Sequence, residues 1–266
     1  MSEEKLINLL NGDCLEQMKT LPDNSVDSIV TDPPYGISFM AKKWDYDVPK
    51  VEVWKEAMRV LKPGGHALIA CGTRTQHRMV VNIEDAGFEI RDVVSWIYGS
   101  GFPKSLNIHK KDERCLEGWG TALKPACEFF TLCRKPLSEK TIAANVLKWG
   151  TGGINIDACR VGDNPGYSYP NGAGGNSFSV GDKPDGKRTE PVKSTQGRFP
   201  ANLIHDGSRE VLELFPETKP SRIGKPRGTK KKGLFANSKF NKVGQEHNDS
   251  GSASRFFYCH KASLGS

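Results

Sequence analysis

The feature that most constrains this fold is an alternation of strand-like and helix-like segments through residues 1–137. The predicted strands are 6–10, 26–31, 66–71, 89–98 and 127–133, and the predicted helices are 15–21, 51–61 and a segment from Thr73 or Thr75 to Ala86. Within 51–61, apolar residues recur every three or four positions, which is typical of an amphipathic helix. The alternation predicts an α/β fold in which helices cover both faces of a mostly parallel sheet.

A glycine-rich string, Lys62-Pro63-Gly64-Gly65, follows the helix predicted over 51–61. Proline cannot continue a helix, and glycine suits the left-handed residue that often ends one. We therefore expect the helix to stop at this string and the next strand to begin at His66.

The sequence changes character after residue 137. A helix is predicted over 141–149 and a short strand over 153–160, before a tract over 162–197 that is rich in Gly, Pro, Ser and Asn. Long loops without regular structure are uncommon in compact domains, so this tract is expected to be functional or disordered. We divide the chain into a core over 1–137, a loop-rich region over 138–254 and a return strand within 255–266.

Composition narrows the functional classes. The net charge of +7 and the pI near 9.0 are compatible with nucleic-acid binding. Between Ser221 and Lys242 there is no acidic residue but eight basic ones, Arg222, Lys225, Arg227, Lys230, Lys231, Lys232, Lys239 and Lys242. This basic tract predicts a phosphate-binding surface, with a merely solvated loop as the alternative.

Other features argue against membrane and metal-binding classes. The mean hydropathy is −0.52, and no apolar run approaches the roughly 20 residues that a membrane span needs. The N-terminus lacks the pattern of a signal peptide, so we expect a cytoplasmic protein. The seven cysteines contain no C-x-x-C pair and the six histidines are scattered, which predicts reduced thiols and no metal site.

The second predicted strand ends in Asp32-Pro33-Pro34-Tyr35. Open α/β sheets bind ligands at the carboxyl ends of their strands. An exocyclic amino group of a base is a poor nucleophile because its lone pair is conjugated with the ring. Two fixed acceptors, the Asp32 carboxylate and the Pro33 carbonyl, would hold its N–H groups and free that lone pair. Tyr35 offers a flat face for an extruded base, and a rigid turn without catalytic function is the alternative.

The chain closely resembles the site-specific amino-methyltransferases of DNA in which the catalytic motif precedes the cofactor motif. The similar strings are Gly12 to Pro22, Ser25 to Tyr35, Trp54 to Gly65, Gly99 to Ser105, Gly118 to Pro125 and Arg255 to Tyr258. The resemblance implies a partial Rossmann-like methyltransferase sheet, S-adenosylmethionine as methyl donor and double-stranded DNA as partner. The acceptor would be adenine N6 or cytosine N4, and D-P-P-Y in this group more often marks an adenine enzyme.

Residue roles follow from the same resemblance. Asp32, Pro33, Pro34 and Tyr35 match the catalytic motif, while Asp13, Cys14 and Asp32 are the expected cofactor-binding residues. Residues 138–254 would form the target-recognition region. Within it, the expected phosphate contacts are Lys225, Arg227, Lys230, Lys231 and Lys232.

The sequence departs from the family pattern at its C-terminal end, where a D-P-F-x-G-x-G strand for the cofactor is expected and does not occur. The strings Gly150-Thr151-Gly152-Gly153 and Gly172 to Gly175 are weak substitutes, because they do not follow apolar strands. Three explanations stay open: a truncated enzyme, a split enzyme or homodimer completed by a second subunit, and a DNA-binding chain without activity. Methylation of RNA or of a protein glutamine is a further alternative.

Overall fold

The computed structural model describes residues 7–38, 43–103, 105–162, 166–168, 192–194, 197–219 and 250–259. Its α-helices are α1 (Cys14–Lys19), α2 (Val51–Val60), α3 (Gln76–Asp85), α4 (Ile142–Trp149) and α5 (Arg209–Leu212). Its strands are β1 (Val26–Thr31), β2 (Leu61–Gly72), β3 (Glu89–Ile97), β4 (Cys127–Arg134), β5 (Gly166–Ser168), β6 (Val192–Ser194), β7 (Leu203–His205), β8 (Glu217–Thr218), β9 (Gly251–Ser252) and β10 (Tyr258–Cys259).

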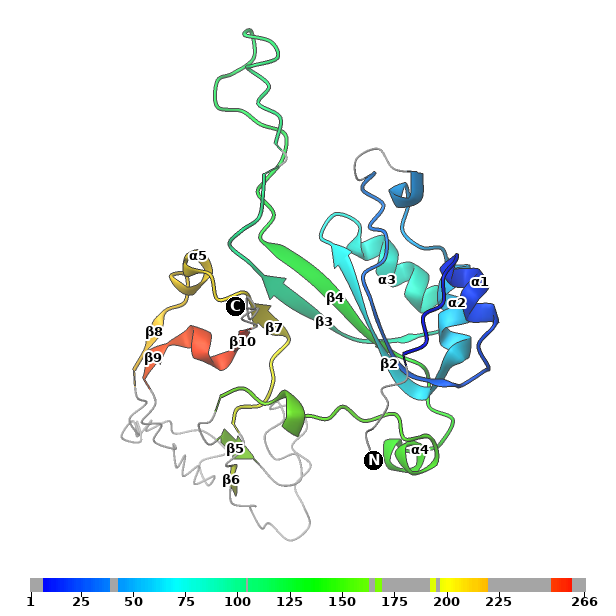
Figure 1. The fold of residues 1–266 in the computed structure, drawn as a ribbon. Helices are drawn as coiled ribbons and strands as arrows, with labels where there is room; N and C mark the ends of the chain where they lie inside the picture. Colours follow the sequence, from blue (N-terminus) through cyan, green and yellow to red (C-terminus); the bar gives the residue numbers. More distant parts are fainter. Residues whose placement is uncertain are drawn as a thin grey trace, which may run out of the picture.

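Six strands form the main sheet in the order β1-β2-β4-β3-β7-β10 (Figure 1). The pairs β1–β2, β3–β7 and β7–β10 are parallel, whereas β4 runs antiparallel to both β2 and β3. The α/β class and the mostly parallel sheet are therefore confirmed, and β4 is the one strand of this sheet that runs against the other five. The reason is that β4 returns from a long connection and inserts between β2 and β3.

Helices α2 and α3 cover one face of the sheet. Trp54 and Ala57 of α2 and Met79 and Ile83 of α3 join Ile69 of β2 in one buried core. Helix α1 packs on α2, and all three helices lie on the same side of the sheet in Figure 1. The expectation of helices on both faces is thus wrong for these three helices, because their apolar stripes converge on a single face.

The glycine-rich string after α2 does not separate helix from strand. Leu61 already has an extended backbone, so β2 begins there and includes Pro63 and Gly64. Gly64 does have a positive φ of 79°, and its N–H donates to Lys135 O at 3.1 Å. Pairing with the end of β4 therefore extends the strand through a string that predicts a stop.

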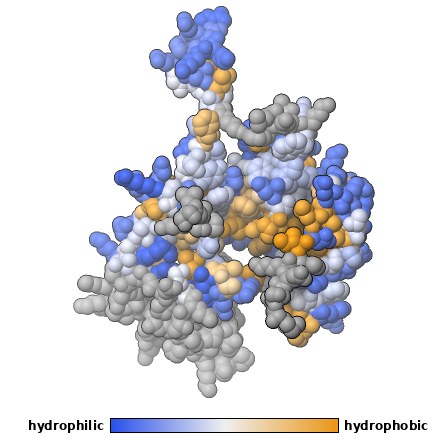
Figure 2. Space-filling model, viewed as in Figure 1, coloured by the Kyte–Doolittle hydropathy of each residue, from blue (hydrophilic) through white to orange (hydrophobic). Residues whose placement is uncertain are grey.

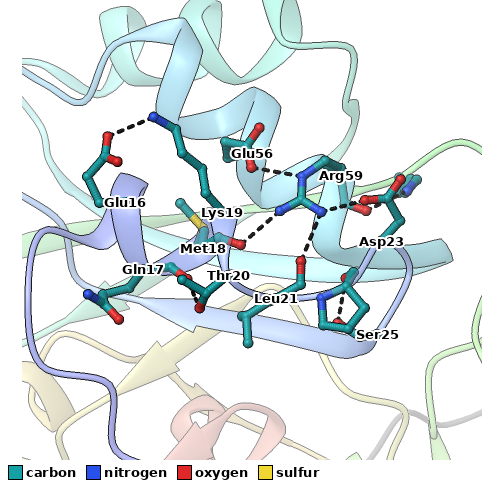
Figure 3. Close-up of polar contacts among 12 residues, drawn as sticks. Glu16, Gln17, Met18, Lys19, Thr20, Leu21, Asp23, Ser25, Glu56 and Arg59 are labelled. Atoms are coloured by element: carbon teal, nitrogen blue, oxygen red, sulfur yellow. Dashed lines mark hydrogen bonds and ion pairs between the residues drawn. The ribbon is translucent and has the colours of Figure 1, made fainter.

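Arg59 of α2 fixes the chain that leads into β1 (Figure 3). Its guanidinium donates to Leu21 O at 3.0 Å and to Met18 O at 2.8 Å, and it pairs with Asp23 and Glu56. A planar guanidinium with five donors suits such a multiple contact. These bonds tie α1 to α2 and set the start of the strand that delivers Asp32.

Three predicted strands differ from the structure. Residues 7–10 form no strand and are exposed, with Ile7 85% and Leu9 88% accessible, while Leu6 lies outside the described residues. Residues 153–160 contain a 3₁₀ turn, Asp157–Cys159, instead of a strand. The predicted 255–262 strand shortens to β10, preceded by the 3₁₀ turn Ala253–Phe256. In the described part of the chain, none of these three segments has a long strand to pair with.

Strands β7 and β10 extend the main sheet beyond β3, so part of the 138–254 region joins the sheet of the core. The pairs β5–β6 and β8–β9 form two small separate sheets. The structure contains no helix long and apolar enough to cross a membrane among the residues searched, which are the described ones.

Candidate active site at the carboxyl edge of the sheet

The carboxyl ends of β1, β2 and β3 meet at one edge of the sheet. These three strands point the same way because β1 is parallel to β2, and β4 is antiparallel to both β2 and β3. Asp32 follows β1 at this edge, Gly72 ends β2, and Glu128 lies near the start of β4. Tertiary structure thus gathers residues from distant parts of the sequence at the place where such sheets bind ligands.

Tyr35 is positioned by the end of β2. Its ring is half-buried, and its Cδ2 atom lies 3.1 Å from the position that a Cβ atom on Gly72 would occupy. Asp32 is exposed, whereas Pro33 and Pro34 are half-buried. The structure therefore places all four predicted catalytic residues together, with the Asp32 carboxylate open to solvent beside a fixed aromatic ring.

Asp45 anchors the loop that follows the motif. Its carboxylate is buried and accepts a hydrogen bond from Gly36 N–H at 2.9 Å, while its own carbonyl accepts one from Ser38 N–H at 2.7 Å. Gly36 has a φ of +67°, and a Cβ atom there would lie 2.9 Å from Val48 N. The turn after Tyr35 thus requires glycine and is held by one buried acid.

Electrostatic interactions at the carboxyl edge of the sheet involve four residues, Asp32, Tyr35, Cys71 and Glu128. Burial raises the pKa of the Tyr35 phenol, and a hydrogen bond to Asp32 and the charge of Asp32 raise it further. Burial also raises the pKa of Glu128, with a second contribution from the charge of Asp32. Burial likewise raises the pKa of the Cys71 thiol. Two carboxyl groups and a tyrosine therefore influence one another here, as often happens at functional sites.

Two strings that lie apart in the sequence meet on the arm, which we define as residues 98–126 between β3 and β4. Figure 1 shows the arm projecting from the sheet. Ser105 Oγ accepts a hydrogen bond from Thr121 N–H at 3.0 Å, and Thr121 Oγ1 accepts one from Leu106 N–H at 3.0 Å. The base of the arm is tied to β7, because Asp206 Oδ2 accepts from Gly99 N–H at 2.9 Å. The arm therefore starts from the same edge as the catalytic motif.

Asp13 and Cys14, the other expected cofactor-binding residues, lie at the start of α1 and are exposed. Asp13 Oδ1 caps this helix by accepting from Leu15 N–H at 3.0 Å and Glu16 N–H at 3.2 Å. Among the described residues, no hydrogen bond or ion pair joins either residue to Asp32 or Tyr35. Asp13 thus has a structural function of its own, whatever else it binds.

The string Gly150 to Gly153 serves to end α4 and contact β2. Gly150 takes the left-handed conformation at the C-cap, and the Thr151 hydroxyl donates to Pro63 O at 2.6 Å. Buried Asn145 donates to Pro63 O and to Thr151 O, both at 2.8 Å. This packing accounts for the glycines without a cofactor, while Gly172 to Gly175 lie outside the described residues.

The other predicted site residues cannot be located, since Lys225, Arg227, Lys230, Lys231 and Lys232 lie outside the described residues. All seven cysteines are free. No cluster of His, Cys, Asp or Glu in the described ranges could hold a metal ion.

Sequence reasoning missed Gly72, Asp45 and Glu128. A signal existed for Glu128, because it is the one charged residue in the apolar run Cys127 to Cys133. Gly72 and Asp45 gave no such signal, since their functions depend on contacts with Tyr35 and Gly36 that only the fold creates.

Comparison with known proteins shows which family the chain belongs to. A family model described as DNA methylase matches residues 26–171, more than half of the chain. The Type II methyltransferase M.HindIII from Haemophilus influenzae is 26% identical over 200 residues, covering 55% of this chain and 64% of M.HindIII. M.BglII from Bacillus subtilis is 28% identical over 127 residues, covering 41% of this chain and 33% of M.BglII. The chain thus spans less than two thirds of either relative.

Two solved structures are similar to about half of this chain. M1.HpyAVI, solved as a complex with SAM, has a TM-score of 0.34 and 23% identity, covering 51% of this chain and 56% of that one. The cytosine-N4-specific PvuII DNA methyltransferase has a TM-score of 0.34 and 19% identity, covering 50% of this chain and 51% of that one. The match over residues 26–171, which begins with β1 and includes the Asp32–Tyr35 motif, shows that the chain belongs to the DNA methylase family of the N6/N4 type.

Proposed function

We propose that this chain transfers a methyl group from S-adenosylmethionine to the exocyclic amino group of a flipped base in DNA, at adenine N6 rather than cytosine N4. The observation that carries the proposal is the Asp32–Tyr35 motif at the carboxyl edge of β1, with the Tyr35 ring fixed against Gly72. Family membership and the Type II methyltransferase relatives support a restriction-modification setting.

The residues of the motif would orient the acceptor. The exposed Asp32 carboxylate and the Pro33 carbonyl would accept the two N–H groups of the amino nitrogen and draw its lone pair out of conjugation. Tyr35 would stack on the extruded base. As the nitrogen gains a methyl group it becomes positively charged, and the Asp32 carboxylate would stabilise that charge and accept the proton that leaves.

The residues present fit the donor in part. Asp32 offers an exposed carboxylate at the edge, and Asp13 uses Oδ1 for its helix cap, which leaves Oδ2 to accept a hydrogen bond from an amino group. Asp13, Cys14 and Asp32 would therefore hold S-adenosylmethionine, which when bound supplies the electrophilic methyl group.

A second subunit or a second copy would complete the donor site at the outer edge of β1. In the described part of the chain β1 pairs with β2 alone, and Val30 is 77% exposed. Figure 2 shows hydrophobic side chains gathered over the middle of the viewed face. Open apolar strand edges are usually covered by another chain segment. If the chain alone binds S-adenosylmethionine tightly and one-to-one in calorimetric titration, this part of the proposal is wrong.

The basic tract would hold the DNA within a target-recognition region over 138–254. Lys225, Arg227, Lys230, Lys231 and Lys232 would contact phosphates, so replacing all five with alanine should flatten the dependence of log K on log salt. Each lost phosphate contact reduces that slope by about 0.9. An unchanged slope would rule these residues out as phosphate contacts.

The decisive experiment is methylation of duplex DNA followed by mass spectrometry of the nucleosides. We expect N6-methyl-2′-deoxyadenosine to form with the wild-type chain, together with any partner that it needs. Asp32→Ala should abolish the product and leave duplex binding largely intact. Formation of N4-methylcytosine would show that the acceptor is cytosine rather than adenine. Equal loss of DNA binding and methyl transfer in Asp32→Ala would refute the catalytic assignment. Duplex binding without transfer under all conditions would favour a DNA-binding chain without activity.

A further inference from the structure

Glu128 lies on the same face of the sheet as the Tyr35 ring. In the antiparallel register Glu128 of β4 is directly opposite Gly72 of β2 and Trp96 of β3. Side chains of directly opposed residues lie on one face and close together. Because the Cβ position of Gly72 is 3.1 Å from the Tyr35 ring, the Glu128 side chain shares that corner with Tyr35.

The half-buried Glu128 carboxyl group has no hydrogen-bond or ion-pair partner in the described part of the chain. The indole Nε1 of Trp96, directly opposite, is buried and also lacks a partner within the described structure. A half-buried carboxyl group that no described residue pairs with contributes little to folding and is free to act on the site beside it.

Among the described residues, the titratable groups that interact with the charge of Glu128 are a carboxyl group, tyrosines and a thiol. They are Asp32 and Tyr35 from the motif, Tyr98 after β3, and Cys127 of β4. The charge of Glu128 raises the pKa of Tyr35 and of Tyr98, in each case after the larger effect of burial. Glu128 therefore acts on the catalytic motif through its charge.

We propose that Glu128 is a positioning residue of the methyl-transfer site, where its charge acts on the Asp32–Tyr35 pair and sets the lower pH limit of activity. This inference rests on the proposed methyl-transfer function and adds a second acidic residue, Glu128, to the proposed site. When both carboxyl groups are ionised, they jointly stabilise the positive charge that appears on the amino nitrogen. At low pH their mutual repulsion favours protonation of one of them, and the site loses part of that stabilisation.

The first test does not require methyl transfer by the chain. In a carbon-13 NMR titration of the wild-type chain, the Glu128 carboxyl resonance is assigned by its loss in Glu128→Gln. The pKa of Glu128 should fall in Asp32→Asn, because a like charge is removed. It should stay unchanged in Glu84→Gln, which alters an exposed carboxylate of α3. An unchanged Glu128 pKa in Asp32→Asn would overturn the proposal.

The second test measures methyl transfer against pH. Glu128→Gln should move the midpoint of the acid limb to lower pH, because one repelling charge is gone, and should reduce the rate above that limb. Glu128→Asp should keep the wild-type midpoint, and Glu84→Gln should match the wild type. Equal loss of rate at every pH in Glu128→Gln would indicate a structural role and refute the proposal. Absence of transfer by the wild type would reject the proposed function, whereas the NMR titration would still decide whether the charges interact.

Discussion

The ring of Tyr35 lies against Gly72, with Cδ2 3.1 Å from the position that a Cβ atom of residue 72 would take. These residues are 37 positions apart in the sequence and meet because β1 and β2 are parallel neighbours. A glycine at the end of β2 thus fixes the aromatic residue of the proposed catalytic motif.

Gly72→Ala should reduce methyl transfer while leaving the fold intact. The added methyl group would force the Tyr35 ring to shift by a few tenths of an ångström. Small misplacements at a reacting centre cost on the order of 10- to 100-fold in rate. Steady-state methylation kinetics measure the effect. Gly153→Ala is the matched control, since its nearest neighbour is Val146 Cγ2 at 3.9 Å, and a wild-type rate in Gly72→Ala would show that ring position is unimportant.

Asp45→Ala should both destabilise the chain and reduce transfer. The substitution leaves the partly buried Gly36 N–H without its Asp45 acceptor, which costs about 1–3 kcal/mol. Urea unfolding measures the loss, and Asp85→Ala, on the exposed side of α3, is the control. Equal stability of the two variants would show that Asp45 does not hold the loop after Tyr35.

His66 should make the chain less stable at acid pH. Burial lowers the pKa of His66 below its usual value, and the charges of Arg134 and Arg91 lower it further. The unfolded chain therefore binds a proton at about pH 6.5 that the folded chain does not accept. The urea midpoint should fall as the pH drops below that value.

His66→Gln should lose part of this pH dependence, because glutamine does not titrate. His77→Gln, at an exposed position of α3, should retain the wild-type dependence. An identical fall in the wild type and in His66→Gln would contradict the assignment.

The cysteines should differ sharply in their reaction with iodoacetamide. Burial raises the pKa of the Cys133 thiol to about 12, so Cys133 should stay unmodified in the folded chain at pH 8. Exposed Cys14 and Cys159 should be alkylated, and mass spectrometry of peptides locates the modification.

S-adenosylmethionine should slow the alkylation of Cys14 but not that of Cys159, if the donor binds at the start of α1. The complete assembly, including any second subunit, is the material for this measurement. Equal rates at Cys14 with and without the donor would remove Cys14 from the cofactor-binding residues.

Much of the local structure follows from the sequence, because it depends on neighbouring residues. The predicted helices over 51–61 and 141–149 agree with α2 and α4 to within one or two residues. Strand β1 occupies the predicted 26–31. Residues 7–10 show the limit of prediction from local sequence. A strand also needs a partner strand, and no strand of the described sheet pairs with these residues.

The sequence by itself determined the α/β class and the presence of the four-residue Asp32–Tyr35 motif at the end of β1, since both depend on short-range patterns of residue types. Only the tertiary structure decided that β4 inserts antiparallel between β2 and β3, and this arrangement brings Glu128 opposite Gly72 and beside Tyr35. The physical reason is that strand order and register depend on contacts between distant segments. No local pattern encodes which residues will share one corner of the sheet.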